Sequence, residues 1–179
     1  LLITAGGTAE KIDQVRSITN HSTGQLGSLI AEAFLAHGYQ VDYLTTPTAL
    51  RPVNQDGLAL HFIQDTKELD ETLTWLLQQK QYDAVIHSMA VSDFTPANSF
   101  SLKAFTEKIN QELTKHSAPF TKEDVASLIE QTTAQETATK ISSDTDYLFL
   151  VLKKTPKVIK KIKEIQPNTI LVSFKLLVN

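Results

Sequence analysis

The sequence contains no cysteine among its 179 residues. Disulfide bridges and thiolate metal sites are therefore excluded, and a cytoplasmic protein is the plain expectation. No apolar run approaches the ~20 residues that a membrane-spanning helix needs, and no signal-peptide pattern opens the chain. The sequence also lacks a large excess of either charge. It has 17 Lys and Arg and 20 Asp and Glu, which give a net charge of −3. This balance argues against a dedicated nucleic-acid binder.

Several catalytic and cofactor signatures are also missing. The glycine stretch after the first apolar run reads AGGTAE, which is not the G-x-G-x-x-G dinucleotide fingerprint. Neither a P-loop nor a G-x-S-x-G nucleophile elbow occurs. The five histidines are scattered, without the close pair of a zinc site. What is present is an ordinary globular composition, with 41% hydrophobic and 21% charged residues in a chain long enough for one domain with a real core.

Short apolar stretches alternate with stretches of helical spacing. We expect helices at residues 24–37, from Asp65 onward and at 156–165. We expect strands at residues 1–5, 40–46, 58–64, 83–91, 146–152 and 168–174. This alternation predicts an α/β protein with a Rossmann-like three-layer fold, in which a mostly parallel sheet carries helices on both faces.

Local patterns add detail to the predicted core elements. Leu26 and Leu29 belong to the apolar stripe of helix 24–37, whereas Leu69, Leu73, Leu76 and Leu77 give the next helix its buried face. Asp65 and Glu68 have the spacing of a capping box. Thr155 and Pro156 have the pattern of an N-cap followed by proline at the first helical position. The stretch 146–152 is the most apolar in the chain and predicts a buried strand.

Residues 98–138 interrupt the alternation because they are polar and helical. A first helix carries Leu102, Phe105, Ile109 and Leu113 on one face, and a second begins at Thr121 with Asp124 in capping-box position. We therefore expect one nucleotide-binding domain over residues 1–179 with a helical insertion that acts as a lid or dimer arm. The chain stops in strand-like sequence, so the C-terminal part of the domain is expected beyond it.

Glycines, hydroxyls and charges follow the predicted strands at their carboxyl ends, where ligands bind in open α/β sheets. The residues in these positions are Gly6, Gly7, Thr8, Ala90, Asp93, Lys154, Pro156 and Phe174. Glycines let a phosphate approach the backbone, helix N-termini bind anions, and Asp93 could hold a ribose or a magnesium-bound water. Together these residues favour a nucleotide site.

Each residue taken singly has an ordinary structural explanation. Gly6–Gly7 is a common turn, Asn20 a turn or cap residue, and Lys140 a solvated lysine. His87 near a strand end is typical of a packed histidine with one hydrogen bond. Lys157, Lys160, Lys161 and Lys163 have the pattern of the wet face of a helix. Only the set as a whole favours function.

The set resembles one family. Residues 3–27 read ITAGGT-x-E-x-ID-x-VR-x-ITN-x-STG-x-x-G, and AVSDF, KISS, TPK and SFK follow in order at 90–94, 140–143, 155–157 and 173–175. This series resembles phosphopantothenate–cysteine ligase, also called phosphopantothenoylcysteine synthetase, of the stand-alone bacterial type. The resemblance covers the chain except for roughly residues 98–138.

The resemblance implies a reaction of coenzyme A biosynthesis. Members join 4'-phosphopantothenate to L-cysteine at the expense of a nucleoside triphosphate, which is CTP in bacterial members and ATP in eukaryotic relatives. The substrate carboxylate attacks the α-phosphate, pyrophosphate leaves, and the amine of cysteine opens the acyl-nucleotidylate, which is an acyl-cytidylate when CTP is used. Mg²⁺ and a homodimer are also implied, whereas nucleic acid and membrane are not expected as partners.

The resemblance also assigns roles to residues. Asn20 and Lys140 match the catalytic positions, with the neutral Asn20 amide hydrogen-bonding the acyl phosphate, and Arg16 joins Asn20 in binding substrate. The nucleotide falls to Gly6, Gly7, Thr8, Ser22, Thr23, Gly24, Ala90, Asp93, Lys154, Pro156 and Phe174, with Asp93 the candidate for metal. One departure is KISSD after Lys140, where many bacterial members carry a K-x-K-K pattern.

Two other classes of function remain open. A Rossmann-type dinucleotide-binding reductase shares the fold but predicts the missing G-x-G-x-x-G fingerprint. A non-catalytic nucleotide-binding module would keep the glycine loop and need neither Asn20 nor Lys140. Hydride transfer or tight NAD binding would favour the first class, whereas turnover that depends on Asn20 and Lys140 would exclude the second.

Overall fold

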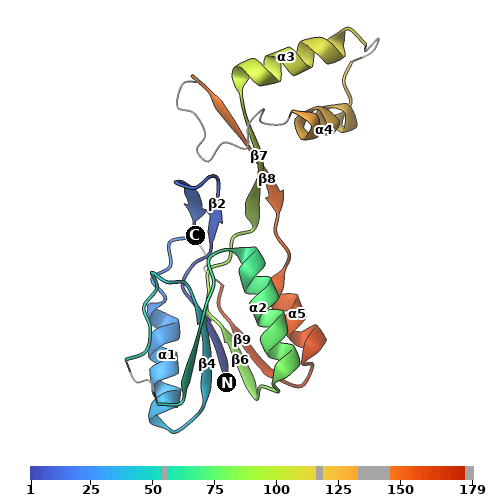
Figure 1. The fold of residues 1–179 in the computed structure, drawn as a ribbon. Helices are drawn as coiled ribbons and strands as arrows, with labels where there is room; N and C mark the ends of the chain where they lie inside the picture. The colour runs from blue at the N-terminus through green and yellow to red at the C-terminus, as the bar shows by residue number, and fades with distance from the viewer. Residues whose placement is uncertain (54–55, 116–118, 133–145, 176–179) are drawn as a thin grey trace. The chain divides into compact units, whose positions relative to one another are not determined.

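The computed structural model describes residues 1–53, 56–115, 119–132 and 146–175 (Figure 1). The chain divides into two compact units. The first unit comprises Leu1–Glu10, Ile18–Asp93 and Thr155–Asn179, and the second comprises Lys11–Ser17 and Phe94–Lys154. No helix among the described residues is both long and apolar enough to cross a membrane.

The first unit is built on a five-stranded sheet in the order β5-β4-β1-β6-β9. Every neighbouring pair is parallel. The strands are β1 (Leu2–Ala5), β4 (Val41–Thr45), β5 (Leu58–Phe62), β6 (Ala84–His87) and β9 (Ile170–Ser173). The chain therefore builds outward from β1 to β5 and then returns to the other side of β1, so the strand order reverses between β1 and β6. Such a switch point is where open α/β sheets bind ligands.

Helices cover both faces of this sheet (Figure 1). On one face, α1 (Gln25–Ala36) buries Ala31 and Leu35 against strand residues such as Ile3 and Tyr43. On the other face, α2 (Thr66–Gln79) and α5 (Val158–Ile165) bury a second cluster around Leu2 and Val85. The predicted Rossmann-like three-layer fold is confirmed.

The leucine stripe of α2 is buried as predicted, with Leu69, Leu73, Leu76 and Leu77 all in the core. Asp65 caps the helix by accepting a hydrogen bond from the Glu68 N–H. The return bond of the predicted box differs, because the Glu68 carboxylate accepts from the N–H of Gln64 rather than Asp65. The helix start is therefore predictable from sequence to within one residue.

Helix α1 turns a different face to the sheet than its leucines predict. Leu26 and Leu29 are 49% and 56% exposed, and the buried positions include Gly27 and Ser28. A Cβ built on Gly27 would lie 2.5 Å from the Ala5 Cβ. Small residues thus let α1 approach β1 closely, and that approach outweighs the burial of the two leucines.

The predicted start of α5 is also wrong. Lys157, not Thr155, is its N-cap residue, and Pro156 lies before the helix. The Thr155 hydroxyl donates instead to the Ser92 carbonyl at 2.6 Å, and its N–H donates to the Asp93 carbonyl at 3.0 Å. Because these bonds tie Thr155 to the segment after β6, the helix begins later in the chain.

The second unit is a two-stranded antiparallel ribbon with helices. Its ribbon pairs β7 (Phe94–Ser101) with β8 (Leu148–Lys154), and its helices are α3 (Leu102–Leu113) and α4 (Lys122–Gln131). The two predicted helices of the insertion are present, and the capping box of Thr121 and Asp124 is formed. The expected helical start at residue 98 is wrong, because residues 98–101 belong to β7. Phe100 stacks on Phe105 and Phe149 at 5.1 and 5.4 Å between ring centroids.

The ribbon corrects the prediction of a buried strand at 146–152. Within the described part of the chain, strand β8 pairs with β7 alone, and most of its residues are exposed. An apolar run predicts a strand but does not say which sheet the strand joins.

The long segment between β1 and α1 contains a small hairpin. Strands β2 (Ala9–Lys11) and β3 (Ser17–Thr19) pair within residues expected to be loop. The Ala9 N–H donates to the Gln64 carbonyl at 2.8 Å, which joins the base of the hairpin to the segment before α2.

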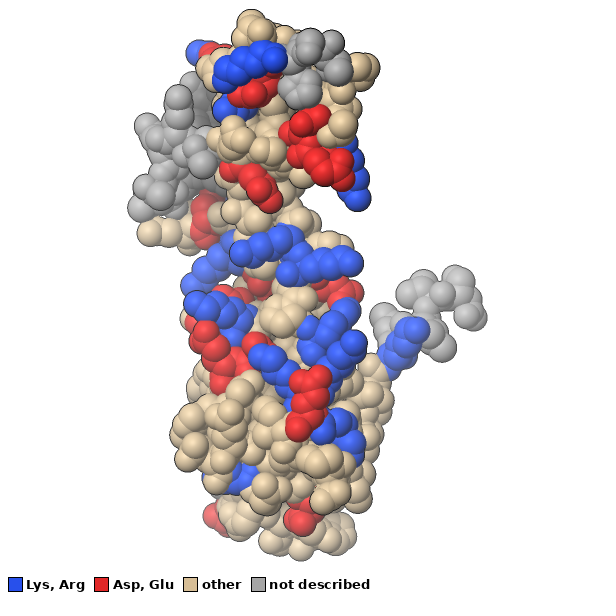
Figure 2. Space-filling model, turned by 90° about the vertical axis from the view of Figure 1, so that its right-hand side faces the viewer, with Lys and Arg blue, Asp and Glu red and all other residues tan. Residues whose placement is uncertain are grey.

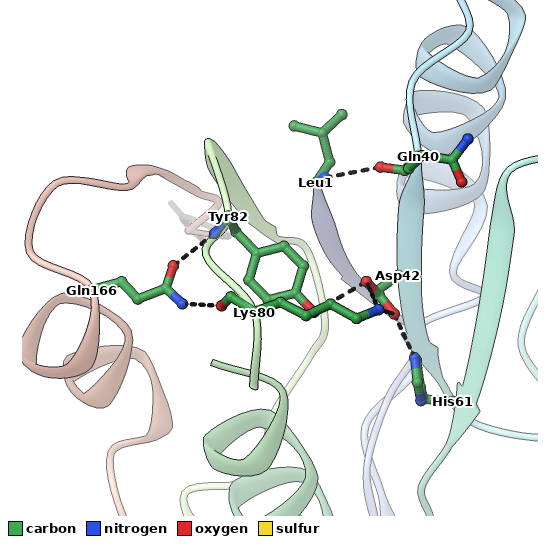
Figure 3. A network of polar contacts seen from close by, with 7 residues as sticks. All are labelled: Leu1, Gln40, Asp42, His61, Lys80, Tyr82 and Gln166. Atoms are coloured by element: carbon green, nitrogen blue, oxygen red, sulfur yellow. Dashed lines mark hydrogen bonds and ion pairs between the residues drawn. The ribbon is translucent and has the colours of Figure 1, made fainter. Parts of the chain in front are cut away.

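The buried carboxylate of Asp42 in β4 forms hydrogen bonds with side chains of neighbouring segments (Figure 3). Asp42 accepts hydrogen bonds from Lys80 at 2.9 Å, His61 at 2.8 Å and Tyr82 at 3.1 Å. Burial alone would raise the pKa of Asp42, but these three donors outweigh it and the pKa lies below its ordinary value. Beside this network, Gln166 bonds the backbone of Lys80 and Tyr82.

Candidate functional site

The candidate site lies at the switch point, where the segments after β1 and β6 are joined. The Ala90 N–H donates to the Gly6 carbonyl at 2.8 Å, and the Thr8 N–H donates to the Ala90 carbonyl at 3.1 Å. Gly7 and Ala90 thereby form a parallel bridge beyond the ends of the strands. Four residues predicted for the nucleotide, Gly6, Gly7, Thr8 and Ala90, are thus brought together.

The glycines are required for close packing. Gly6 has φ +93°, and a Cβ there would lie 2.8 Å from the Ala49 Cβ. A Cβ on Gly7 would lie 2.6 Å from the Asn20 carbonyl oxygen, which is backbone and cannot swing aside. Gly6 and Gly7 therefore let the segments around Ala49 and Asn20 close over the end of β1.

Asn20 is placed beside this glycine turn. Its N–H donates to the Thr8 carbonyl at 3.5 Å, and its side-chain Nδ2 lies 3.3 Å from both the Ala90 carbonyl and the Ser92 Oγ. The side chain is half-buried. The sequence predicted Asn20 for the site, and the structure holds it against both loops of the switch point.

The N-terminus of α1 completes the loop. Its N-cap residue, Gly24, has φ +77° and no side-chain capping bond, and the first turn has no acidic residue. A Cβ on Gly24 would lie 3.2 Å from the Gly6 nitrogen, so this helix end adjoins the glycine turn. The helix dipole and the amides of the first turn suit an anion such as phosphate.

Ser22 and Thr23 lie in the same turn. The Ser22 N–H donates to the Asn20 carbonyl at 3.0 Å, and the Thr23 hydroxyl accepts from the Gln25 N–H at 3.3 Å. The N-terminus of α2 is different, because Asp65 caps it and the buried Glu10 accepts from the Thr66 N–H at 2.9 Å. With carboxylates already bound to its first turn, α2 is poorly suited to a phosphate.

Two residues near the site were missed or undervalued. Ser92 is buried and contacts both Thr8 and Asn20, and its only sequence signal was its place in AVSDF. Lys157 was expected on a solvated helix face, but its Nζ lies 2.5 Å from the Asp93 Oδ1. Both members of that ion pair are about two-thirds exposed, at 66% and 69%, so solvent screens it.

Lysines elsewhere on α5 also have partners. Lys161 bonds Asp70 at 2.6 Å, and Lys163 donates to the carbonyls of Pro167 and Thr169. Figure 2 shows basic and acidic side chains intermixed on the face that it presents. Lys161 and Lys163 therefore form specific bonds within the first unit, beyond the solvation expected of them.

The remaining predicted residues belong to the second unit, lie at exposed positions of the first, or fall outside the described residues. Arg16 and Lys154 belong to the second unit, where two guanidinium nitrogens of Arg16 contact the Asp13 carboxylate at 2.6 and 3.0 Å. Pro156 and Phe174 are exposed residues of the first unit. Lys140 lies outside the described residues.

Metal ligands are sparse in the described ranges. No group of three or more His, Asp or Glu side chains that could hold a metal ion occurs there. Asp93 is already paired with Lys157, so it offers a single, shared carboxylate. These residues would fit Mg²⁺ only as a companion of bound phosphates, which is how Mg²⁺ commonly binds.

His87 is a packed histidine, as its position predicted. Its Nδ1 lies 2.8 Å from the Thr4 hydroxyl, and the residue is buried at the end of β6. Burial lowers the pKa of His87 to about 4, so the ring is neutral at physiological pH.

A parallel sheet in this order, with a glycine turn and an uncapped helix end at its switch point, defines the class of Rossmann-like α/β proteins that bind ligands at the strand ends. Residues 1–127 match the family described as DNA/pantothenate metabolism flavoprotein C-terminal domain. The chain belongs to this family.

Curated relatives match this chain over part or nearly all of its length. The coenzyme A biosynthesis bifunctional protein CoaBC of Thermococcus kodakarensis is 31% identical over 175 residues, which are 98% of this chain and 33% of that protein. The CoaBC protein of Bacillus subtilis is 40% identical over 103 residues, 58% of this chain and 25% of that protein. The chain thus spans about a third or less of these curated relatives.

Solved structures agree with the fold. The DNA/pantothenate metabolism flavoprotein from Streptococcus pneumoniae is 41% identical with a TM-score of 0.78, covering 99% of this chain and 69% of that one. A Cab2 mutant in complex with phosphopantothenate-cysteine shares the fold with a TM-score of 0.63 at 22% identity, covering 99% of this chain and 64% of that one.

Proposed function

We propose that this protein is a ligase that joins 4'-phosphopantothenate to L-cysteine in coenzyme A biosynthesis. Membership of the family and relatives named for coenzyme A biosynthesis support the proposal. A solved structure of the same fold contains phosphopantothenate-cysteine, the product of such a reaction. The observation that carries the proposal is the neutral Asn20 amide, held beside a glycine turn and an uncapped helix N-terminus.

The proposed reaction has two steps. The carboxylate of 4'-phosphopantothenate attacks the α-phosphate of a nucleoside triphosphate, and pyrophosphate leaves. The amine of L-cysteine then attacks the acyl carbon, and the nucleoside monophosphate leaves. Bringing two anions together for the first step requires neutralised charge and alignment, which backbone amides and a helix N-terminus supply without mobile solvent.

Residues of the first unit fit the tasks at the nucleotide, and the resemblance adds Lys140 and Arg16 of the second unit. The amides of Gly6 and Gly7 and the first turn of α1 would face the phosphates, beside Thr8. Asp93 would hold the ribose, and Phe174 would line the base. Lys140 would stabilise departing pyrophosphate, and Arg16 would bind the substrate phosphate. Mg²⁺ would accompany the triphosphate and offset its charge.

We further propose CTP as the nucleotide, with ATP as the alternative, because the resemblance is to the bacterial type. Nucleoside triphosphates and free cysteine are metabolites of the cytoplasm, which is therefore the proposed location.

The second unit supports a proposal of homodimerisation. Leu148 and Phe149 are adjacent in β8, so their side chains point to opposite faces of the ribbon, and both are exposed. Phe105 of α3 packs against Phe149 on one face, with 5.3 Å between ring centroids. Leu148 and Leu152 lie on the other face at 40% and 41% exposure, and a two-stranded ribbon is marginal in water by itself. We propose that a second copy of the chain packs on this ribbon.

Pyrophosphate release tests the ligase. The full chain is mixed with 4'-phosphopantothenate, L-cysteine and Mg²⁺, in parallel with CTP, ATP, GTP and UTP. We expect release with CTP and formation of phosphopantothenoylcysteine, and an Asn20→Asp variant that stalls after activation. Absence of release with every nucleotide would reject the ligase, and NAD binding with hydride transfer would favour the reductase. Nucleotide binding without turnover would favour the binding module.

A further inference from the structure

The orientation of the Asn20 amide is fixed by its neighbours. Its Nδ2 lies 3.3 Å from the Ala90 carbonyl oxygen and 3.3 Å from the Ser92 Oγ. A backbone carbonyl only accepts hydrogen bonds, so the amide atom that faces it must be the nitrogen. The two hydrogens of the NH₂ group are therefore directed at two acceptors on the segment after β6.

Ser92 is itself held firmly. Its N–H donates to the Thr8 Oγ1 at 3.0 Å, and the Thr8 hydroxyl donates to the Ser92 Oγ at 3.2 Å. On the other side, the Ser92 carbonyl accepts from the Thr155 hydroxyl at 2.6 Å. Ser92 and Thr8 are 7% and 0% exposed, so water does not compete freely for these bonds. The acceptor that meets Asn20 is thus preorganised.

Thr8 is anchored in turn to the start of α2. The Thr66 hydroxyl lies 3.4 Å from the Thr8 Oγ1 and donates to the buried Glu10 at 2.6 Å. Polar contacts therefore run from the first turn of α2 through Thr8 and Ser92 to Asn20. The chain of contacts leaves the Asn20 Oδ1 as the amide atom that no donor among the described residues reaches.

We propose that Ser92 is a positioning residue, which turns the Asn20 amide so that its Oδ1 accepts a hydrogen bond from the attacking amine of L-cysteine. This inference rests on the proposed ligase function and deepens it. It differs from the sequence-based expectation that the amide donates to the acyl phosphate, because the donors of the amide are already used within the protein.

The chemistry of the second step suits an acceptor. As the amine nitrogen forms its bond to the acyl carbon, the bond from that carbon to the phosphate oxygen breaks, and the electron pair leaves with the nucleoside monophosphate. The amine gains positive charge and gives up one proton, which the departing phosphate takes. An amide oxygen is too weak a base to take that proton, but it can align the lone pair of the amine by holding one N–H.

The test separates the two steps in a Ser92→Ala variant. Without cysteine, activation gives a burst of pyrophosphate, and added cysteine or hydroxylamine then consumes the acyl-nucleotidylate. We expect an unchanged burst and aminolysis slowed by about five- to tenfold, the loss of roughly one hydrogen bond. Ser92→Thr, which keeps the hydroxyl, should restore most of the rate. Ser88→Ala is the matched control, because its hydroxyl bonds the Thr4 carbonyl instead.

The outcomes distinguish this inference from the function on which it rests. No burst from the unaltered protein would reject the ligase. A normal burst with unaltered aminolysis in Ser92→Ala, or an equal loss in both steps, would reject the positioning role and leave the ligase standing. If Ser92→Ala does not fold, Ser92→Cys replaces it, since a thiol has similar size and is a weak acceptor.

A measurement without substrate tests the geometry directly. The side-chain amide protons of Asn20 can be followed by NMR, with Asn20→Ser to assign them. We expect both protons to exchange slowly with solvent in the unaltered protein and in Ser88→Ala. In Ser92→Ala, the proton directed at Ser92 should exchange faster, while the Ala90 carbonyl still holds the other. Exchange as fast as that of an exposed asparagine in the unaltered protein would overturn the proposal.

Discussion

His87 is a residue whose environment sets how the protein responds to acid. Burial lowers the pKa of its ring to about 4, from an ordinary value of 6.5. The unfolded chain therefore takes up a proton at higher pH than the folded one. The contribution of His87 to stability is complete above the unfolded pKa and is lost as the pH falls toward the folded pKa.

This shift predicts a pH-dependent free energy of unfolding. Between pH 6.5 and about 4, His87 should cost the folded state about 3 kcal/mol. His87→Gln, which still offers Thr4 a polar partner, should flatten the profile in that window. Urea unfolding across the window measures the effect, with the exposed His37→Gln as control. A variant that keeps the original slope would contradict the assignment.

The close packing around Gly27 should reverse the usual effect of a glycine-to-alanine substitution on stability. Glycine to alanine inside a helix normally stabilises by about 1 kcal/mol. At Gly27 the new Cβ would lie 2.5 Å from Ala5 and 2.7 Å from the Ser88 Oγ. Overpacking of this kind costs about 1–3 kcal/mol, so Gly27→Ala should lower the free energy of unfolding.

The exposed Ala33 of the same helix calibrates this measurement. Ala33→Gly should cost about 1 kcal/mol by propensity alone. If Gly27→Ala raised the midpoint of urea unfolding while Ala33→Gly lowered it, the close approach of α1 to β1 would be refuted.

Some of the individual residues of the candidate site could be predicted from the sequence. Gly6, Gly7 and Ala90 followed from strand ends, because parallel strands end at one edge of the sheet. Asn20 followed only from the resemblance. Ser92 was missed because a serine in a loop carries no periodic signal, and its partner Thr8 is 84 positions away in the chain.

At the scale of elements, prediction succeeded where one pattern decided the outcome. The leucines of α2 are large and evenly spaced, so their face is buried as expected. In α1, close packing at Gly27 competes with burial of the leucine side chains. The spacing of residues in the sequence does not indicate which of the two is more favourable. Strand β8 shows the same limit, because its apolar run did not reveal that it pairs with β7 outside the main sheet.

The side chain of Gln166, at the end of α5, forms hydrogen bonds with the backbone at and after the end of α2. We expect these bonds to contribute to the free energy of unfolding. This residue is 2% exposed, and its Nε2 donates to the carbonyls of Leu77 and Lys80 at 2.7 and 2.6 Å. Its Oε1 accepts from the Tyr82 N–H at 3.0 Å (Figure 3). Gln166→Leu would leave three backbone groups without this partner and should cost about 2–4 kcal/mol.

Chemical denaturation measures that cost, with Gln78→Leu on the exposed face of α2 as control. The control should change stability by less than about 0.5 kcal/mol. Equal effects of the two variants would show that the bonds of Gln166 contribute little.

At the scale of the whole molecule, the chain consists of two compact units. The first contains the sheet, the glycine turn and Asn20. The second contains the ribbon and helices α3 and α4. Removing the second unit outright would also remove Lys140, so its role is better tested by single substitutions on its surface.

The proposed homodimer makes the last prediction. Leu152 of β8 is 41% exposed, and a glutamate there would place a charge on the ribbon where the second copy is proposed to pack. Burying an unpaired charge is costly, so Leu152→Glu should convert a dimer into a monomer.

Leu113→Glu in α3 is the matched control, since it is the same substitution at a 53% exposed site in the same unit. Sedimentation equilibrium over a range of concentrations measures the change, and circular dichroism checks that the fold is retained. A protein that is monomeric without substitution, or a Leu152→Glu variant that stays dimeric while Leu113→Glu dissociates, would reject the ribbon as the dimer surface.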